Sequence, residues 1–308
     1  MNRLIVFLTV FTLLIAGCTP ASSSPATDSA ILTSTTFLAD ITRNVAGDRL
    51  TVESLLPVGA DPHAYQPTPQ DAAKVADSRL LIVNGMEYEH FIETLLENAG
   101  GERMVVTASE GLEARHMEEH AGEAEAGSGH AHEAGDPHMW LDPNLVVTYA
   151  ENIRDGLIQF DPEGEAVYRS NAEAYIAELK NLDAWIVEQV AQVPQGRHLL
   201  VTNHEALGYF AERYGFTIAG TVIESFSSGA SPSAGQMADL IAQIQSSGAP
   251  AIFLDASDNE SLARQIAAET GVDVVIDLHL ESLTDGAPAA TYIEMMKHNV
   301  TLIVNALK

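Results

Sequence analysis

The sequence predicts an α/β fold made of two Rossmann-like lobes, each with a parallel sheet, joined by one long α-helix. Short apolar runs alternate with amphipathic stretches along most of the chain, which is typical of parallel sheets with helices on both faces. A helical segment of about 31 residues near the middle separates the two halves of this alternation. The folded part begins near Ala30, and its roughly 280 residues are enough for two lobes of ordinary domain size.

The first 17 residues are predicted to be a lipoprotein signal peptide. Arg3 supplies the positive start, and the apolar run Leu4–Ile15 is too short to span a bilayer comfortably. The run ends in Ile15-Ala16-Gly17-Cys18, which resembles the bacterial lipobox, whose cysteine becomes the lipid-bearing N-terminus. Cys18 is the only cysteine, so it has no disulfide partner; the alternative is a chance cysteine after the signal of a soluble secreted protein. We expect a lipid anchor at Cys18 and a flexible tether at residues 18–29.

The net charge of −28 limits the classes of partner. Nucleic acid and anionic lipid surfaces are poor partners for so acidic a chain. A cationic ligand is favoured, although the same charge also fits solubility in a salty or acidic habitat. We expect a monomer that lies outside the cytoplasm, at the cell surface or on the periplasmic face of a membrane.

Residues 30–160 are predicted to form the first lobe. Four apolar runs have the length of strands, and the stretches between and after them have helical periodicity. The strands are predicted at Ile31–Thr36, Thr51–Leu56, Leu80–Val83 and Met104–Val106, and the helices at Leu38–Val45, Gln70–Ala76, Glu89–Asn98 and Asn144–Phe160.

A histidine-rich acidic segment, residues 114–135, interrupts this lobe. It contains His116, His120, His130 and His132 among glutamate, glycine and alanine. That composition cannot offset the entropy of ordering, so we expect a disordered loop. Four histidines favour weak auxiliary metal binding over a merely solvated insert, and such binding should be loose.

The long helix is predicted to link the lobes over residues 161–194. Asp161 is a plausible N-cap, Pro162 suits the first helical position, and Pro194 ends the helix. Its apolar residues keep one face buried, and its length of roughly 46 Å would reach along both lobes. The alternative is two shorter helices with a break near Asn181.

Residues 195–308 repeat the alternation and form the second predicted lobe. Strands are predicted at His198–Thr202, Thr217–Ile223, Ala251–Leu254 and Asp273–Asp277, and helices at Glu205–Tyr214, Ala234–Gln245, Glu260–Glu269 and Ala289–His298.

Four side chains are candidates for one metal site. The triplets Asp61-Pro62-His63 and Asp136-Pro137-His138 each place an imidazole, the commonest metal ligand among side chains, after a proline that stiffens the backbone. In open α/β sheets ligands bind outside the carboxyl ends of strands. His63, His204 and Glu281 follow predicted strands, and His138 precedes a helix. Because each lobe supplies two of the four, an interlobe cleft could gather them.

Three imidazoles and one carboxylate suit zinc, which takes such ligands at about 2.0–2.2 Å in tetrahedral geometry. The Irving–Williams order favours zinc or copper over manganese at a nitrogen-rich site. The fourth ligand is the least certain member, with His279, Asp277 or water as alternatives to Glu281. His90, His198 and His298 are predicted to be surface groups.

Taken together, these motifs make the chain similar to the metal-binding lipoproteins that feed zinc or manganese to bacterial ABC importers, the cluster A-I solute-binding proteins. The resemblance covers essentially the whole mature chain. It is carried by the lipobox, by Asp61-Pro62-His63 with Tyr65-Gln66-Pro67-Thr68-Pro69, by Asn84-Gly85-Met86-Glu87-Tyr88-Glu89, by Asp136-Pro137-His138-Met139-Trp140-Leu141-Asp142-Pro143, by Asn203-His204-Glu205-Ala206-Leu207-Gly208-Tyr209-Phe210, and by Pro288-Ala289-Ala290-Thr291-Tyr292 through Asn299.

The resemblance implies two α/β lobes joined by a single long helix, with metal between them and an ABC permease as partner. The family's ligand positions fall on His63, His138, His204 and Glu281. The third position looks like glutamate in manganese-type members, and the fourth departs from the family's usual Asp-Ser pair by having Glu281-Ser282. A histidine-rich loop is similar to that of zinc-type members, so Zn²⁺ is the expected cargo and Mn²⁺ the alternative.

The resemblance therefore implies a non-enzymatic receptor. The rival function is a surface zinc hydrolase with Glu281 or Glu205 as general base. This function lacks support because the chain has no His-Glu-x-x-His helix. An adhesin role has only the surface location in its favour. A long helix across both lobes predicts small lobe rotations and local loop movement on metal binding.

Overall fold

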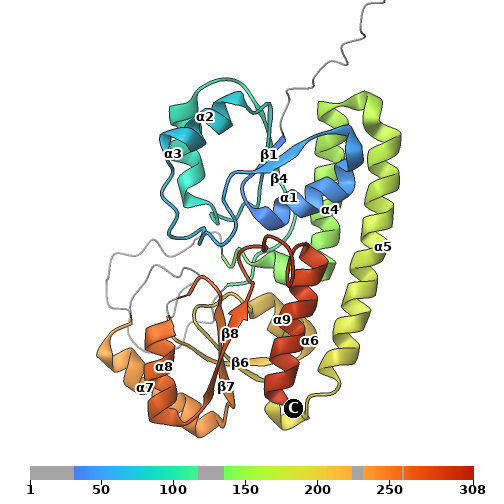
Figure 1. Cartoon of the computed structure of the whole chain (residues 1–308). Coiled ribbons are helices and arrows are strands. Elements are labelled where there is room, and N and C mark those ends of the chain that lie inside the picture. The colour runs from blue at the N-terminus through green and yellow to red at the C-terminus, as the bar shows by residue number, and fades with distance from the viewer. Residues whose placement is uncertain (1–30, 117–134, 224–231, 259) are drawn as a thin grey trace, which may run out of the picture.

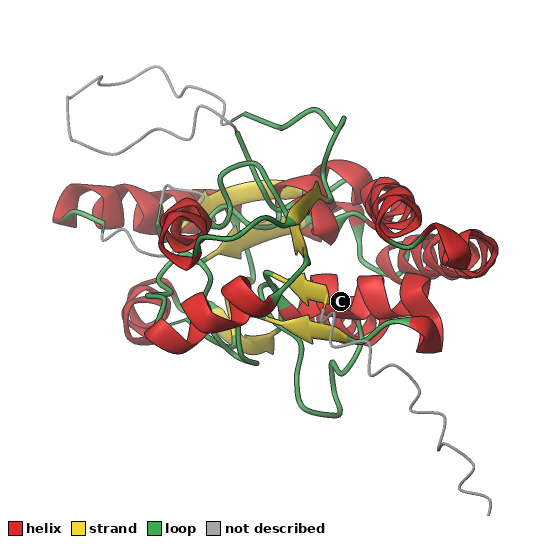
Figure 2. Ribbon diagram, turned by 90° about the horizontal axis from the view of Figure 1, so that it is seen from above, coloured by secondary structure: helices red, strands yellow, loops and turns green. Residues whose placement is uncertain are grey.

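A computed structural model describes residues 31–116, 135–223, 232–258 and 260–308. It confirms the predicted class: two α/β lobes, each with a four-stranded sheet whose neighbouring strands are all parallel. Helices lie on either side of the strands (Figure 2). Cys18, the signal peptide, the tether and the loop histidines His120, His130 and His132 lie outside the described residues.

The first lobe has the strand order β2-β1-β3-β4. Strand β2 is added on one side of β1 and strands β3 and β4 on the other, so the switch point of the strand order lies between β1 and β3. Its strands are β1 (Ile31–Thr33), β2 (Val52–Ser54), β3 (Leu80–Val83) and β4 (Met104–Thr107). Its helices are α1 (Thr36–Ala46), α2 (Pro69–Asp77), α3 (His90–Ala99) and α4 (Pro143–Phe160), with 3₁₀ turns at Gly47–Arg49 and Met139–Leu141.

The second lobe repeats this arrangement with the order β6-β5-β7-β8. Its strands are β5 (Leu199–Thr202), β6 (Thr217–Thr221), β7 (Ala251–Asp255) and β8 (Asp273–Leu278). Its helices are α6 (Gly208–Tyr214), α7 (Ala234–Ser247), α8 (Glu260–Thr270) and α9 (Tyr292–Leu307). The strand order therefore has its switch point beside β5. Open α/β sheets bind ligands at such switch points, outside the carboxyl ends of the strands.

The linking helix α5 (Glu165–Val190) runs without a break past Asn181, so the alternative of two shorter helices is wrong. Figure 1 shows it along both lobes. Asp161 and Pro162 are the N-cap and first residue of a 3₁₀ turn at Pro162–Gly164, which precedes α5. The Asp161 side chain makes no capping hydrogen bond and instead accepts from Arg49 (Nη2, 2.9 Å) and from the Tyr168 hydroxyl. Another 3₁₀ turn, at Gln195–Arg197, follows α5.

Among the other boundaries that differ from the predictions, two have clear local reasons. The strand predicted over Ile31–Thr36 ends at Thr33, because the Thr35 hydroxyl caps α1 by accepting from the Leu38 amide. The helix predicted over Glu205–Tyr214 begins only at Gly208. The Thr202 hydroxyl donates to the His204 carbonyl at 2.8 Å, which closes a turn ahead of the helix.

One hydrophobic core spans both lobes. It includes Phe37 of α1, Trp140 before α4, Tyr175 of α5, and Tyr292 and Ile303 of α9, each 3% exposed or less. Helix α5 packs against α1, α4 and α9. The linking helix therefore belongs to the shared core. Among the described helices, none combines the length and the apolar character needed to cross a membrane.

Candidate metal centre

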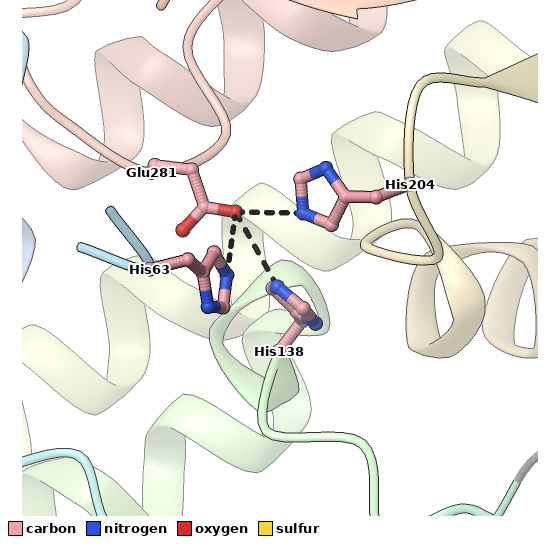
Figure 3. Close-up of side chains that lie close together, drawn as sticks. All are labelled: His63, His138, His204 and Glu281. Atoms are coloured by element: carbon pink, nitrogen blue, oxygen red, sulfur yellow. Dashed lines mark hydrogen bonds and ion pairs between the residues drawn. The ribbon is translucent and has the colours of Figure 1, made fainter. Parts of the chain in front are cut away.

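Four side chains converge between the lobes: His63, His138, His204 and Glu281 (Figure 3). One potential ligand atom from each lies within 4.8 Å of all the others. The Nε2 atoms of His204, His138 and His63 lie 3.2, 3.3 and 3.8 Å from the same carboxylate oxygen, Oε1 of Glu281. All four side chains are at most 2% exposed. The cluster therefore offers three nitrogens and one oxygen around one point.

The fold explains why residues so far apart in sequence meet. His63 lies in the loop between β2 and α2, and Glu281 lies in the loop after β8. His204 follows β5 at the switch point of its sheet, and His138 directly precedes the 3₁₀ turn before α4. The capping box of Thr68 and Asp71, with Pro69 in the first turn, fixes the start of α2 after the His63 loop.

His138 is oriented by the aspartate of its own triplet. Asp136 Oδ1 accepts from Nδ1 of the imidazole at 2.8 Å and from the backbone amide of His138 at 3.0 Å. This partner leaves Nε2 facing the cluster, which is how metal-binding histidines are usually held. Burial works to lower the pKa of His138, but hydrogen bonds to Asp136 and Glu281 outweigh it and raise the pKa to about 9.

Asp136 is completely buried and is held in turn by Arg115, whose Nη1 lies 3.1 Å from its other oxygen. Arg115 also pairs with Glu212 of α6 at 2.9 Å, and its backbone amide donates to the Tyr209 hydroxyl at 2.9 Å. Gly208 makes room for this contact, since a Cβ there would come within 1.7 Å of the guanidinium. At the start of the predicted loop, Arg115 therefore ties the chain to α6 of the second lobe.

Glu281 has different partners on its two oxygens. Oε1 faces the three imidazoles, while Oε2 accepts from the Tyr88 hydroxyl. Burial works to raise the pKa of Glu281, but the charge of His138 and the close approach of the three imidazoles to Oε1 outweigh it. The pKa of Glu281 is held well below its ordinary value. Its backbone amide donates to the buried carboxylate of Asp255 at 3.3 Å, which fixes the loop after β8.

His63 differs from the other two histidines. Its ring is 1% exposed, and neither Nδ1 nor Nε2 has a hydrogen-bond partner. Asp61 holds the backbone of this triplet through its Oδ1, which accepts from the His63 amide at 2.8 Å. An unpartnered buried polar group costs about 1–3 kcal/mol, so a ring held this way is suited to a ligand such as a metal ion.

The other candidate histidines lie away from the cluster. His279 packs its ring against His298 at 5.3 Å, and Asp277 is exposed, so neither joins the four residues that converge. The Nε2 of His298 lies 2.9 Å from the Asp277 carbonyl, and His198 lies near the carbonyls of Val193 and Gly215. His90 begins α3, and His116 is exposed.

Two contributors to the site were not predicted from the sequence. In the sequence, Tyr88 stands out only as part of the Asn84–Glu89 motif, and Arg115 falls within the predicted loop. A hint for Arg115 was its isolated positive charge in an acidic segment. Nothing in the sequence pattern indicates that Tyr88 contacts a residue of the other lobe.

Comparison with known proteins shows which family the chain is similar to. Residues 31–306 match the family model described as zinc-uptake complex component A, periplasmic. The manganese-binding lipoprotein MntA of Halalkalibacterium halodurans is 34% identical over 302 residues, 97% of this chain and 96% of that protein. The iron-binding protein YfeA of Yersinia pestis is 31% identical over 303 residues, 96% and 93% of the two chains. The periplasmic zinc-binding protein TroA from Treponema pallidum has a similar structure, with a TM-score of 0.80 at 27% identity over 91% of this chain and 99% of that one.

Proposed function

Because the chain belongs to the family of zinc-uptake complex component A, and is thus a metal-binding solute-binding protein of an ABC importer, we propose that its cargo is Zn²⁺. His63, His138, His204 and Glu281 bind the ion, and the loaded protein delivers it to the permease of the importer. The observation that carries this proposal is the convergence of three imidazole nitrogens and one carboxylate oxygen in a buried cluster.

The donor set favours zinc over manganese. Zinc accepts four N and O ligands in a tetrahedron at about 2.0–2.2 Å, whereas manganese prefers more oxygen ligands and binds nitrogen-rich sites more weakly. The names of similar proteins include zinc, manganese and iron, so the residues of this chain are the better guide. Mn²⁺ is the alternative cargo.

Metal analysis of the purified protein, followed by competition between Zn²⁺ and Mn²⁺, tests the proposal. We expect one tightly bound zinc, lost in His63→Ala and kept in His298→Ala, whose imidazole lies beside His279 and outside the cluster. Failure to find tight zinc in the wild type, or an unchanged tight site in His63→Ala, would rule it out.

The four-residue cluster also supports a carrier over a hydrolase. Catalytic zinc sites keep a position open for water beside three protein ligands. Here Glu281, one of the two candidate bases, points its Oε1 at all three imidazoles and fills the fourth position. No turnover of ester or peptide substrates is expected from the zinc-loaded protein.

Anchoring at Cys18 and auxiliary binding in the histidine-rich loop complete the proposal. Several related proteins are named lipoproteins, which supports lipidation of Cys18 and a location outside the cytoplasm. His116, His120, His130 and His132 would gather zinc weakly near the site. A Cys18→Ala protein that still fractionates with membranes would contradict the anchor.

A further inference from the structure

We infer that Tyr88 sets the metal preference of this site by holding Glu281 so that only one carboxylate oxygen can bind the ion. Tyr88 is a positioning residue in this account, and the inference rests on the proposed function. It adds a determinant of zinc-over-manganese selectivity that is not itself a ligand.

The two oxygens of Glu281 are separated by their surroundings. Oε1 lies 3.2–3.8 Å from the three Nε2 atoms, and Figure 3 shows the three contacts meeting on this one oxygen. Oε2 accepts the hydroxyl hydrogen of Tyr88. Bidentate binding would require Oε2 to give up this bond and turn toward the metal.

Tyr88 is held too firmly to follow such a turn. It is completely buried, and its ring lies 4.7 Å from that of Trp140, 5.2 Å from that of His63 and 6.4 Å from that of Phe37, measured between centroids. These rings surround it within the core shared by the lobes.

The backbone before Tyr88 is also committed to one conformation. Gly85, Met86 and Glu87 have φ values of 92°, 54° and 56°, and such left-handed residues persist only where the surroundings enforce them. The buried carboxylate of Glu89 accepts from the amides of Asn84 at 2.6 Å and Gly85 at 3.2 Å. This strained loop serves to deliver the Tyr88 hydroxyl to Glu281.

A carboxylate limited to one oxygen leaves four donors in the cluster. Four donors complete the tetrahedron of zinc, whereas manganese, which prefers octahedral oxygen-rich sites, is left short of ligands. Without the Tyr88 hydroxyl, Oε2 can turn toward the ion and supply a fifth donor, which helps manganese more than zinc.

The test compares the wild type with Tyr88→Phe, using Zn²⁺, Mn²⁺ and Co²⁺ as probes. We expect the ratio of the manganese Kd to the zinc Kd to fall about tenfold, equivalent to about 1.4 kcal/mol. The visible absorption of bound Co²⁺ should weaken as the site moves from four to five ligands. Tyr168→Phe is the matched control: its ring is also buried, but its hydroxyl donates to Asp161, beside the start of the linking helix.

An unchanged Kd ratio and cobalt spectrum in Tyr88→Phe would overturn the inference while leaving the proposed function intact. Absence of tight zinc in the wild type would overturn the proposed function itself. X-ray absorption of the wild-type zinc complex provides a test that does not depend on the folding of a variant. Four nitrogen or oxygen neighbours support the inference, and five contradict it.

Discussion

The two Asp-Pro-His triplets look alike in sequence but should respond differently to the same substitution. Asp136 holds the imidazole of its histidine, with its Oδ1 2.8 Å from Nδ1 of His138. Asp61 accepts from the backbone amide of His63, whose Nδ1 has no hydrogen-bond partner. We predict that Asp136→Asn weakens zinc binding far more than Asp61→Asn.

The expected size follows from these contacts. The substitution replaces a charged acceptor by a neutral one, and charge-assisted hydrogen bonds are about twice as strong as neutral ones. It also removes the buried carboxylate with which Arg115 forms an ion pair and leaves an uncharged amide in its place. Loss of a residue that orients a metal ligand typically costs 10–100-fold in affinity, about 1.4–2.8 kcal/mol. For Asp61→Asn we expect less than about threefold, near 0.6 kcal/mol, because the ring of His63 is untouched.

Competition with a chelator of known zinc affinity measures both variants. Urea unfolding of the metal-free proteins shows whether a loss of affinity reflects a loss of fold. Equal losses in the two variants, or unchanged affinity in Asp136→Asn, would refute the idea that Asp136 orients His138.

Five further predictions concern the metal-free protein, pH, the histidine-rich loop and motion. His63→Leu should abolish tight zinc binding yet raise the free energy of unfolding of the metal-free protein by about 1–2 kcal/mol in urea, since it removes an unpartnered buried ring; a fall would contradict this. The raised pKa of His138 means that this group stabilises the metal-free fold fully below about pH 6.5, and the stabilisation disappears as the pH rises to about 9. The lowered pKa of Glu281 has the opposite effect: this group stabilises the fold above about pH 4.5, and the stabilisation is lost in acid. Zinc must displace the His138 proton, so calorimetry in different buffers should show about one proton released per zinc at pH 7, and zero release would be inconsistent with the raised pKa. Deleting residues 117–134 should keep the tight site and lower total zinc bound, whereas a deletion that also removes Arg115 should weaken it. Scattering curves with and without zinc should differ little, and a large change in size would refute a shared rigid core.

The fold and the candidate ligands could be predicted because both follow from local patterns. Parallel strands with helical crossovers leave few topologies, and ligands gather at the carboxyl ends of such strands. This rule selected His63 after β2, His204 after β5 and Glu281 after β8, and the structure brings these three together with His138. It leaves His279 and Asp277 open, because the end of β8 and the loop after it lie at the same edge of the sheet, and their residues differ in the direction of the side chains.

The partners of the ligands could not be predicted, because they depend on packing between the lobes. Tyr88 meets Glu281 across 193 positions of sequence and Arg115 meets Glu212 across 97, and no periodicity encodes either contact. Asp161 fitted the rules for an N-cap, yet its carboxylate is taken by Arg49 and Tyr168. In each case a tertiary contact decided what local sequence left undetermined.

The lobes are joined by buried hydrogen bonds next to the site as well as by the linking helix. The Leu283 amide donates to the Thr36 hydroxyl at 2.8 Å, the Tyr292 amide to Asp40 at 2.9 Å, and the Trp140 indole to the Leu280 carbonyl at 2.8 Å. A wide hinge opening would break all three and divide the shared core. Release of the ion must therefore depend on smaller movements of the loops that carry the ligands.

The ligands are not equally free to make such movements. His138 is fixed by Asp136, and Glu281 is fixed by Tyr88, so displacing either leaves a buried partner without its bond. The ring of His63 has no such partner, and its loop lies between β2 and the capped start of α2. Movement at His63 breaks no side-chain hydrogen bond of its ring besides the metal bond itself. The same missing partner that makes His63 costly in the metal-free protein leaves its ring free to move when the ion leaves.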